Sequence, residues 1–407
     1  MKALKMLENA LQHTCQLIHA KRLNALMVAV GVANKGCSIA LTSLGRGLGG
    51  EAKEKNNIKR MDRLLGNKKL QGEAHRFYQS IALWAISSNP RPILIGDWST
   101  LTADESLHLL RIGIPVGGRT LTIFEQVYPQ SQYGSQHAHQ CFLDGLKALL
   151  PEGCRPVIVT DAGFKNPWFT IVEAMGWFWV GRVRGGVQMC KSEKGALWLT
   201  SAQVSQILLG EQTKRAVDCG SFWLAKTNPH QVRAVTYKED PKGRVALNKR
   251  GKKSKSGKSK KYAEGAKEAW LLVTNIPPEA ANAIEVVGIY KKRMQIEAGF
   301  RDSKCIRFGL GLDISKSWQK ERWTILVLIA TLTQFLAWIV GKTGYLRDRQ
   351  WDYMANTCKD RKVLSDFFLG VRMLLKEKII APPNSDEQLA LSQAITLEGD
   401  SGLRYLI

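Results

Sequence analysis

Two short amphipathic patterns stand out in the first 85 residues, which are helical in character throughout. Both consist of apolar residues three or four positions apart: Leu41, Leu44 and Leu48 in the first, and Ile58, Met61, Leu64 and Leu65 in the second. A Gly-Gly turn separates them. Lys59, Arg60 and Arg63 face away from the second apolar set. This pattern favours a helix-turn-helix whose second helix enters the major groove of DNA; the alternative is a basic, solvated helix of a helical bundle.

From Pro92 onward the pattern changes to short apolar runs rich in β-branched residues. The runs at 92–97 and 156–161 each end in an aspartate, 119–129 alternates as a strand does, and 177–185 is a further strand candidate. A helical stretch lies at about 137–150. Strands interleaved with helices predict an α/β or mixed-sheet domain.

The segment 190–265 breaks this regularity. Between Pro241 and Lys261 it holds ten lysines and arginines among glycines and serines, so it cannot bury itself and is predicted to be an exposed loop. Such a loop is a solvated linker or a salt-dependent contact to DNA phosphates. Strand character returns at 268–277, a helix is predicted at about 283–304, and the last sixty residues are helical.

The stretch from Trp323 to Val340 carries no charge and just reaches the length of a membrane-spanning helix. It contains three threonines and Gln334, and it is the only such stretch in the chain. A buried helix in the core of a large domain is therefore favoured over a membrane span, and we expect a soluble protein.

The charge of the chain is its most unusual bulk property. Its 407 residues suffice for two or three domains, and 44% hydrophobic and 23% charged residues are ordinary values. The formal net charge of +24 and the pI of about 9.8 are unusually high for a soluble globular protein. Because such an excess costs self-repulsion, it indicates a polyanionic partner, with nucleic acid favoured over an anionic membrane surface or a chance bias.

The eight cysteines include no C-x-x-C pair, which fits neither a zinc site nor a disulfide framework. They predict reduced, mostly buried thiols in a cytosolic protein. The N-terminus, MKALKMLENALQH, places charges where a signal peptide needs an apolar stretch.

Asp97 and Asp161 are the first candidates for chemistry, because each is predicted at the end of an apolar strand. An acid at that position projects into the crevice where open sheets bind ligands. For both residues the alternative is a turn-forming residue or a helix N-cap.

Glu297 adds a third acid on the predicted helix 283–304. Tyr290, Arg293, Glu297 and Lys304 follow one another at spacings of three, four and seven residues, which places all four on one face of a helix. A solvated helix face is the alternative. Mg²⁺ prefers oxygen ligands, and two such ions can stabilise the attacking and leaving oxygens of a displacement at phosphorus. Three carboxylates can hold that pair of ions, while Arg293 and Lys304 bind flanking phosphates.

The same residues match a known signature. Tyr, two residues, Arg, three residues, Glu, six residues, Lys is typical of bacterial DDE transposases of the insertion-sequence-four family, and Tyr290, Arg293, Glu297 and Lys304 satisfy it. Within that family the chain resembles most the transposases of insertion-sequence-ten type. The strings that carry this resemblance, between residues 19 and 312, are HAKRLNAL, NNIKRMDRLLGN, DWS, TDAGFKNPW, GWFWVGRVRG, YKKRMQIE and FGLGL.

The resemblance implies an α/β fold with a ribonuclease-H-like mixed-sheet catalytic core. Asp161 and Glu297 are 136 residues apart, which is too long for the core's own connection and indicates an insertion domain. We therefore expect five regions: a helical DNA-binding domain at 1–85, catalytic core at 86–189, an insertion domain with the basic loop at 190–265, catalytic core again at 266–345, and a helical C-terminal region at 346–407.

The resemblance also implies a cut-and-paste reaction. Asp97, Asp161 and Glu297 would bind two Mg²⁺ ions, for which Mn²⁺ can substitute, and the ends would be cleaved by hydrolysis and hairpin formation before joining to target DNA. Trp270 would stack on a flipped base, with a buried strand residue as the alternative, while Tyr290, Arg293 and Lys304 would contact DNA near the cleaved end. The partners implied are inverted-repeat and target duplexes and a second copy of the chain in the paired-end complex. The expected location is the bacterial cytoplasm, at the nucleoid when DNA is bound.

Three rival functions stay open. A two-metal nuclease or resolvase would share the core and cut without joining, and a decayed transposase could act as a DNA-binding repressor. The third, a membrane-associated protein, depends only on the apolar stretch and the basic charge.

Overall fold

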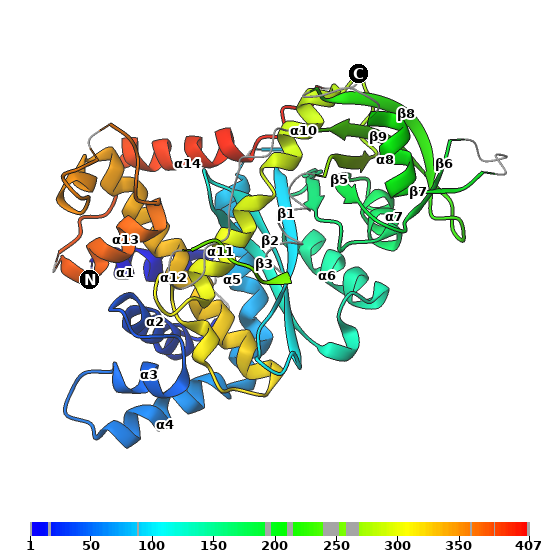
Figure 1. Cartoon of the computed structure of the whole chain (residues 1–407). Helices are drawn as coiled ribbons and strands as arrows, with labels where there is room; N and C mark the ends of the chain where they lie inside the picture. Colours follow the sequence, from blue (N-terminus) through cyan, green and yellow to red (C-terminus); the bar gives the residue numbers. More distant parts are fainter. Residues whose placement is uncertain are drawn as a thin grey trace. The chain divides into compact units, whose positions relative to one another are not determined.

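The computed structural model describes residues 2–14, 18–87, 89–191, 197–209, 215–238, 252–257, 268–358, 360–377 and 379–404. Its contacts divide the chain into two compact units, and Figure 1 labels most of their helices and strands. Unit 1 comprises Met1–Cys154 and Met294–Asp400, and unit 2 comprises Arg155–Arg293 and Ser401–Ile407. This division is coarser than the five expected regions, whose boundaries stay predictions.

Unit 1 contains an antiparallel meander in the order β3-β2-β1. Its strands are β1 (Ile93–Thr100), β2 (Leu107–Pro115) and β3 (Thr120–Pro129), joined by short turns. All residues of β2 are buried, because helices cover the sheet. Pro92 also forms an isolated bridge with Asp400.

Helices make up the rest of unit 1. Those before or directly after the meander are α1 (Lys2–Thr14), α2 (Ala20–Asn34), α3 (Leu41–Arg46), α4 (Glu54–Leu65), α5 (Lys68–Ile86), η1 (Gln130–Gln132) and α6 (Gln136–Leu149). The later ones are α11 (Met294–Lys304), η2 (Leu312–Ile314), α12 (Lys320–Leu346), η3 (Arg349–Asp352), α13 (Asp366–Lys376) and α14 (Ser385–Gly399). Figure 1 shows α12 running among α2, α5 and α13.

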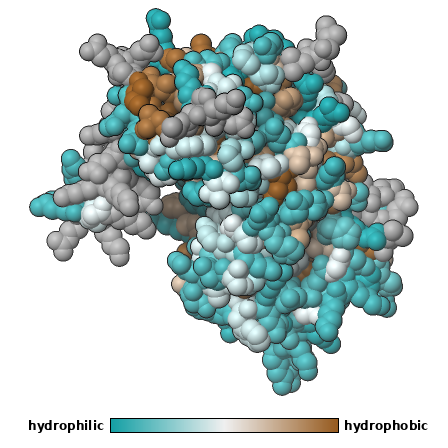
Figure 2. All heavy atoms as spheres, turned by 90° about the vertical axis from the view of Figure 1, so that its right-hand side faces the viewer, coloured by the Kyte–Doolittle hydropathy of each residue, from teal (hydrophilic) through white to brown (hydrophobic). Residues whose placement is uncertain are grey.

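The apolar helix α12 forms the centre of this helical layer. Of its most apolar window, 89% is buried inside the protein, which confirms the prediction of a core helix. It approaches α13 closely because both helices have glycine at the crossing: a Cβ on Gly341 would collide with the carbonyl oxygen of Asp366, and one on Gly370 with that of Ala337. Figure 2 shows one face of the molecule, which is mostly hydrophilic with a small hydrophobic patch and no continuous hydrophobic band.

The two amphipathic patterns of the N-terminal region form α3 and α4, as predicted. Leu44, Leu64 and Leu65 are buried between these helices and their neighbours, and the Asn57 side chain donates to the carbonyl oxygen of Leu48 (3.1 Å).

Unit 2 contains the remaining strands, in the order β4-β5-β10-β9-β8-β6-β7. These are β4 (Val157–Thr160), β5 (Phe178–Val183), β6 (Gln188–Cys190), β7 (Leu199–Thr200), β8 (Val217–Leu224), β9 (His230–Tyr237) and β10 (Trp270–Thr274). β4 and β5 are parallel and connected through α7 (Asn166–Ala174), and the pairs β5–β10, β10–β9, β9–β8, β8–β6 and β6–β7 are antiparallel. The described part of the unit also contains the helices α8 (Ser201–Leu209) and α10 (Ala283–Lys291). The mixed α/β architecture confirms the predicted fold class.

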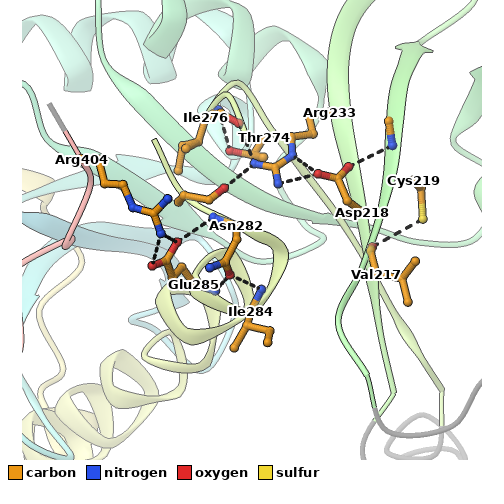
Figure 3. Close-up of polar contacts among 12 residues, drawn as sticks. Val217, Asp218, Cys219, Arg233, Thr274, Ile276, Asn282, Ile284, Glu285 and Arg404 are labelled. Carbon is orange, nitrogen blue, oxygen red and sulfur yellow. Dashed lines mark hydrogen bonds and ion pairs between the residues drawn. The ribbon is translucent and has the colours of Figure 1, made fainter. Parts of the chain in front are cut away.

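An arginine joins β8 and β9 to the connection between β10 and α10. Figure 3 shows Arg233 pointing toward Asp218 on one side and toward the chain around Ile276 on the other. Its guanidinium donates to the Asp218 carboxylate (2.6 and 2.8 Å) and to the carbonyl oxygens of Ile276 (3.1 Å) and Ala281 (2.7 Å). The segment that carries the capping box of α10 is thereby fixed to the sheet.

The cysteines differ in part from expectation. The seven in the described part of the chain are all free, as predicted, but only Cys190 is buried and Cys141 is exposed. The expectation of mostly buried thiols is wrong. Most of the basic stretch 241–261 lies outside the described residues, which include only 252–257 of it.

Candidate functional site

Asp97 lies within β1 and not at its end, which corrects the prediction. The ladder with β2 continues from Asp97, opposite Arg111, to Thr100, opposite His108. The apolar run alone hid this continuation, because residues 98–100 are half-buried and polar or aromatic. Asp97 is itself half-buried.

The face of the sheet that Asp97 occupies can be identified from its cross-strand neighbours. Asp97 is paired with Arg111, which is paired in turn with Glu125, and directly opposite residues project to the same face. Arg111 donates from Nη1 to the Ser303 hydroxyl of α11 (3.0 Å). Asp97 therefore projects toward the face that α11 covers. The next residue, Trp98, projects to the other face.

A buried polar network fixes α11 to this face. Arg111 and Glu125, exposed by only 1% and 0% of their side chains, form an ion pair of 2.7 Å. Glu125 also accepts from the hydroxyls of Tyr78 (2.9 Å) and Thr331 (2.5 Å). The Arg111 guanidinium lies 4.9 Å from the centre of the Phe300 ring. The network thus joins β2 and β3 to α5, α11 and α12.

Lys304 provides a second connection between α11 and β1. Its ammonium group donates to the carbonyl oxygen of Thr100, three residues after Asp97. Burial lowers the pKa of Lys304 below its ordinary value, and the nearby positive charge of Arg111 acts in the same direction. Glu297 lies two turns before Lys304, on the same side of the helix, and is exposed. Two of the three predicted acids therefore lie on elements of unit 1 that contact each other.

Asp161 belongs to unit 2 and directly follows β4, as predicted. Its carboxylate accepts from the backbone N–H of Gly163 (2.8 Å), so the turn-forming alternative also describes it. A Cβ at Gly163 would lie only 2.9 Å from that carboxylate oxygen. Because Asp161 lies in the other unit, the convergence of the three acids stays a prediction.

The signature Tyr290–Lys304 does not lie on one helix, which corrects a second prediction. α10 ends at Lys291 and α11 begins at Met294. Lys292 and Arg293 donate to carbonyl oxygens only three residues earlier, on Ile289 (3.2 Å) and Tyr290 (3.0 Å), which tightens the last turn and interrupts the helix. Tyr290 and Arg293 therefore belong to unit 2, and Glu297 and Lys304 to unit 1.

Tyr290 forms the centre of a charged and aromatic cluster in unit 2. It is buried against Trp270, with ring centres 5.1 Å apart in an edge-to-face arrangement. Burial raises the pKa of Tyr290, while Arg293 and Arg182 oppose the shift and Asp161 adds to it. These three charges are therefore close enough to Tyr290 to affect its ionisation. Trp270 is half-buried at the start of β10, so part of the residue stays accessible.

Sequence reasoning missed two arginine sites. Arg182 on β5 and Arg184, just after its end, bind the Glu268 carboxylate (3.4 and 2.6 Å), and their alternation next to an apolar run was a usable signal. Arg111 interrupts the apolar run of β2, and Glu125 that of β3. Two residues of opposite charge, one in each of two adjacent apolar strands, can indicate a buried ion pair once the register is known.

The predicted DNA-contact residues of α4 are accessible. Lys59, Arg60 and Arg63 are all exposed, whereas the leucines of the same helix are buried. This arrangement agrees with both the helix-turn-helix and the solvated-helix alternatives.

Carboxylate oxygens are the donors that Mg²⁺ prefers, so the chemistry of Asp97, Asp161 and Glu297 fits that ion. No group of three or more His, Cys, Asp or Glu side chains among the described residues is arranged to hold a metal. The predicted donor set is thus chemically suitable, and its convergence from the two units stays a prediction.

Comparison with known proteins identifies the family. A search of curated proteins found no match. The family model described as "Transposase DDE domain" matches residues 88–333, a range that contains the meander of unit 1, the strands of unit 2 and all three acids. The mixed α/β fold agrees with the ribonuclease-H-like class of such domains. The chain therefore belongs to the DDE transposases.

Proposed function

We propose that the protein is a cut-and-paste transposase of the insertion-sequence-four family, closest to the insertion-sequence-ten type. It binds the ends of its element, cleaves them by hydrolysis and hairpin formation, and joins the 3′ ends to target DNA. The family match and the charge of +24 support this proposal. We further propose the five regions 1–85, 86–189, 190–265, 266–345 and 346–407 as its functional domains.

One observation supports the catalytic assignment most directly: α11 is attached to the sheet at two points near Asp97. Arg111, opposite Asp97, binds Ser303, and Lys304 binds the carbonyl oxygen of Thr100. These contacts hold the helix of Glu297 against the strand of Asp97. Asp97 and Glu297, with Asp161 from unit 2, would hold two Mg²⁺ ions, or Mn²⁺ in their place. When bound, the two ions activate the nucleophile and stabilise the leaving oxygen of an in-line displacement.

The neighbouring residues would position the DNA. Tyr290 and Arg293 would bind the phosphate beside the hairpin, and Lys304 a phosphate near the cleaved end. The Trp270 ring would stack on a flipped base, since an aromatic face suits an unstacked base. Its contacts with Tyr290 and Tyr237 (5.1 and 5.6 Å between ring centres) would hold the ring in place.

The remaining assignments concern partners and location. Lys59, Arg60 and Arg63 on α4 would contact the inverted-repeat duplex. Two copies of the chain would assemble on paired ends, because each end requires its own set of acids. The protein would act in the bacterial cytoplasm, at the nucleoid.

Acid substitutions test the proposal. Asp97→Asn, Asp161→Asn and Glu297→Gln should each abolish cleavage of end DNA while binding of that DNA persists. Asp104→Asn is the matched control, because Asp104 lies in the turn after β1 and its hydrogen bonds are to Thr102 and Ser106 of the same turn. Near-normal cleavage by any of the three acid variants would remove that residue from the metal site. If all three cut normally, the catalytic assignment fails.

The nuclease and repressor alternatives are separated by products. Purified protein with paired-end DNA, target plasmid and Mg²⁺ should yield hairpin ends followed by joined products. Cutting without joining would identify a nuclease, and binding without cutting would identify a repressor.

Trp270→Ala should slow hairpin formation more than the first nick, whereas equal slowing would assign the ring to packing.

A further inference from the structure

The connection between α11 and α12, residues 305–319, exposes large apolar side chains beside basic ones. Trp318 has 78% of its surface exposed and Phe308 has 51%. Arg307 and Lys316 in the same segment are exposed as well. Leaving a tryptophan in water forgoes the stabilisation that its burial would give. An accessible tryptophan among cations therefore indicates a binding surface.

This exposure is not the result of a loose chain end. The carbonyl oxygen of Leu310 accepts from the backbone N–H of Ile39 (2.9 Å). The buried Trp323 donates from its indole nitrogen to the carbonyl oxygen of Ser317 (2.8 Å), directly before Trp318. A hydrogen bond thus holds each half of the segment, and the Trp318 side chain extends from a backbone that is fixed in place.

The segment borders the predicted recognition helix. Trp318, Lys316 and Ser317 line a cavity of about 440 Å³ together with Asp62 of α4 and residues at the start of α3. Arg322, which also lines this cavity, forms an ion pair of 2.6 Å with Asp62.

Two lysines at or near this cavity suit a phosphate. Lys316 lines the cavity and is exposed. Lys59, also exposed, lies one turn before Asp62 on α4 and so shares that side of the helix. Positive charge is thus available both next to the tryptophan and on the neighbouring helix.

We propose that residues 315–318 form a second DNA-contact site, in which Trp318 stacks on an unstacked nucleobase of the DNA that α4 binds. Lys316 binds the adjoining phosphate, and Lys59 binds the next stretch of backbone. Aromatic stacking suits any base because every base presents a π-face, and cations beside the ring hold the strand in place. The proposal rests on DNA as the partner in the proposed function, but it does not depend on the three acids.

Binding measured without metal separates this site from catalysis. The full chain in EDTA is titrated with a mixed-sequence duplex and with a single strand, each containing one 2-aminopurine. Trp318→Ala should weaken binding about 5- to 100-fold and abolish the quenching of 2-aminopurine fluorescence, with an unchanged salt dependence. Trp318→Phe should restore most of both signals. Lys316→Ala should lower the slope of log affinity against log salt by about one.

Trp351→Ala is the matched control, since Trp351 is also an exposed tryptophan of unit 1 (49%) but lies on η3. It should bind as the wild type does. If Trp318→Ala loses its fold, Trp318→Leu, which keeps apolar bulk without a ring, takes its place. Binding by Trp318→Ala, or by Trp318→Leu in its place, within twofold of wild type would overturn the proposal, and so would an equal loss in Trp351→Ala. Because cleavage is not measured, neither result depends on the catalytic assignment.

Discussion

Each unit uses an arginine–carboxylate pair between adjacent strands, but the two pairs do different work. In unit 1, Arg111 and Glu125 lie directly opposite each other and are fully buried, with hydroxyls completing the carboxylate. In unit 2, Arg233 reaches diagonally across the bulge at Asp218–Gly220, and Asp218 keeps 35% of its side chain exposed. The role of each pair therefore depends on the further groups to which its arginine and carboxylate are hydrogen-bonded.

The further partners of the first pair lie on the elements of the catalytic site. Ser303 is on α11, with Glu297, and Arg111 is opposite Asp97 on β1. The further partners of Arg233 are the carbonyl oxygens of Ile276 and Ala281, in a connection that carries none of the three acids. We therefore expect damage to the first pair to affect stability and activity together, and damage to the second to affect stability locally.

The largest effect is expected from breaking the buried pair on one side only. Glu125→Ala leaves the Arg111 charge buried without its partner, which should lower the free energy of unfolding by about 3–5 kcal/mol. The double change Arg111→Met with Glu125→Leu removes both charges and should regain most of that loss. Denaturant unfolding followed by circular dichroism measures all of these variants. A loss below about 1 kcal/mol in Glu125→Ala would mean that the pair does not hold the core together.

A smaller and local effect is expected from Arg233→Met. The change removes charge-assisted hydrogen bonds to one carboxylate and two carbonyl oxygens, so the loss should be about 1.5–3 kcal/mol. Amide exchange should rise at 276–285, while β1, β2 and β3 keep their protection. Faster exchange throughout the meander would contradict the local role of this arginine.

The last predictions concern the pH dependence of the unfolding free energy, which differs between the two units. Burial lowers the pKa of His139, in unit 1, to about 4 from 6.5, and its Nε2 accepts from the Trp98 indole (3.2 Å). The neutral form is thus favoured on folding, so its contribution is complete above pH 6.5 and is lost as the pH falls toward 4. In unit 2 the hydrogen bond from His230 lowers the pKa of Glu173 from 4.5, so that contribution is present above 4.5 and is lost at lower pH.

His139→Gln, which retains an acceptor, should therefore flatten the loss of unfolding free energy between pH 6.5 and about 4. Glu173→Gln should lower the unfolding free energy above pH 4.5 and flatten the curve only below that pH. Urea titrations across this range, with tryptophan fluorescence as the signal, distinguish the two variants. Identical curves for wild type and His139→Gln would show that His139 does not titrate with folding.

Local patterns predicted much of the fold. The 3.6-residue periodicity of α3 and α4, the apolar stretch of α12 and the strand ending before Asp161 all appear in the structure. These features depend on neighbours in sequence, so the chain itself contains the necessary information.

Features set by distant contacts could not be predicted in the same way. The prediction that a strand ends at Asp97 was wrong because pairing with β2 extends β1 beyond its apolar run. The break in the helix between Tyr290 and Glu297 was missed because the two residues at the break, Lys292 and Arg293, are of types that commonly occur within helices. Arg111 and Glu125 became recognisable as partners only with the register of β2 and β3.

The break at Lys292 and Arg293 changes how the four-residue signature should be understood. Its members form two couples: Tyr290 and Arg293 share a unit with Asp161, and Glu297 and Lys304 share one with Asp97. A backbone adjustment at this joint would alter the separation between the couples. A substitution at Lys292 alone would thus tune assembly of the catalytic centre while the four signature residues and the three acids stay intact.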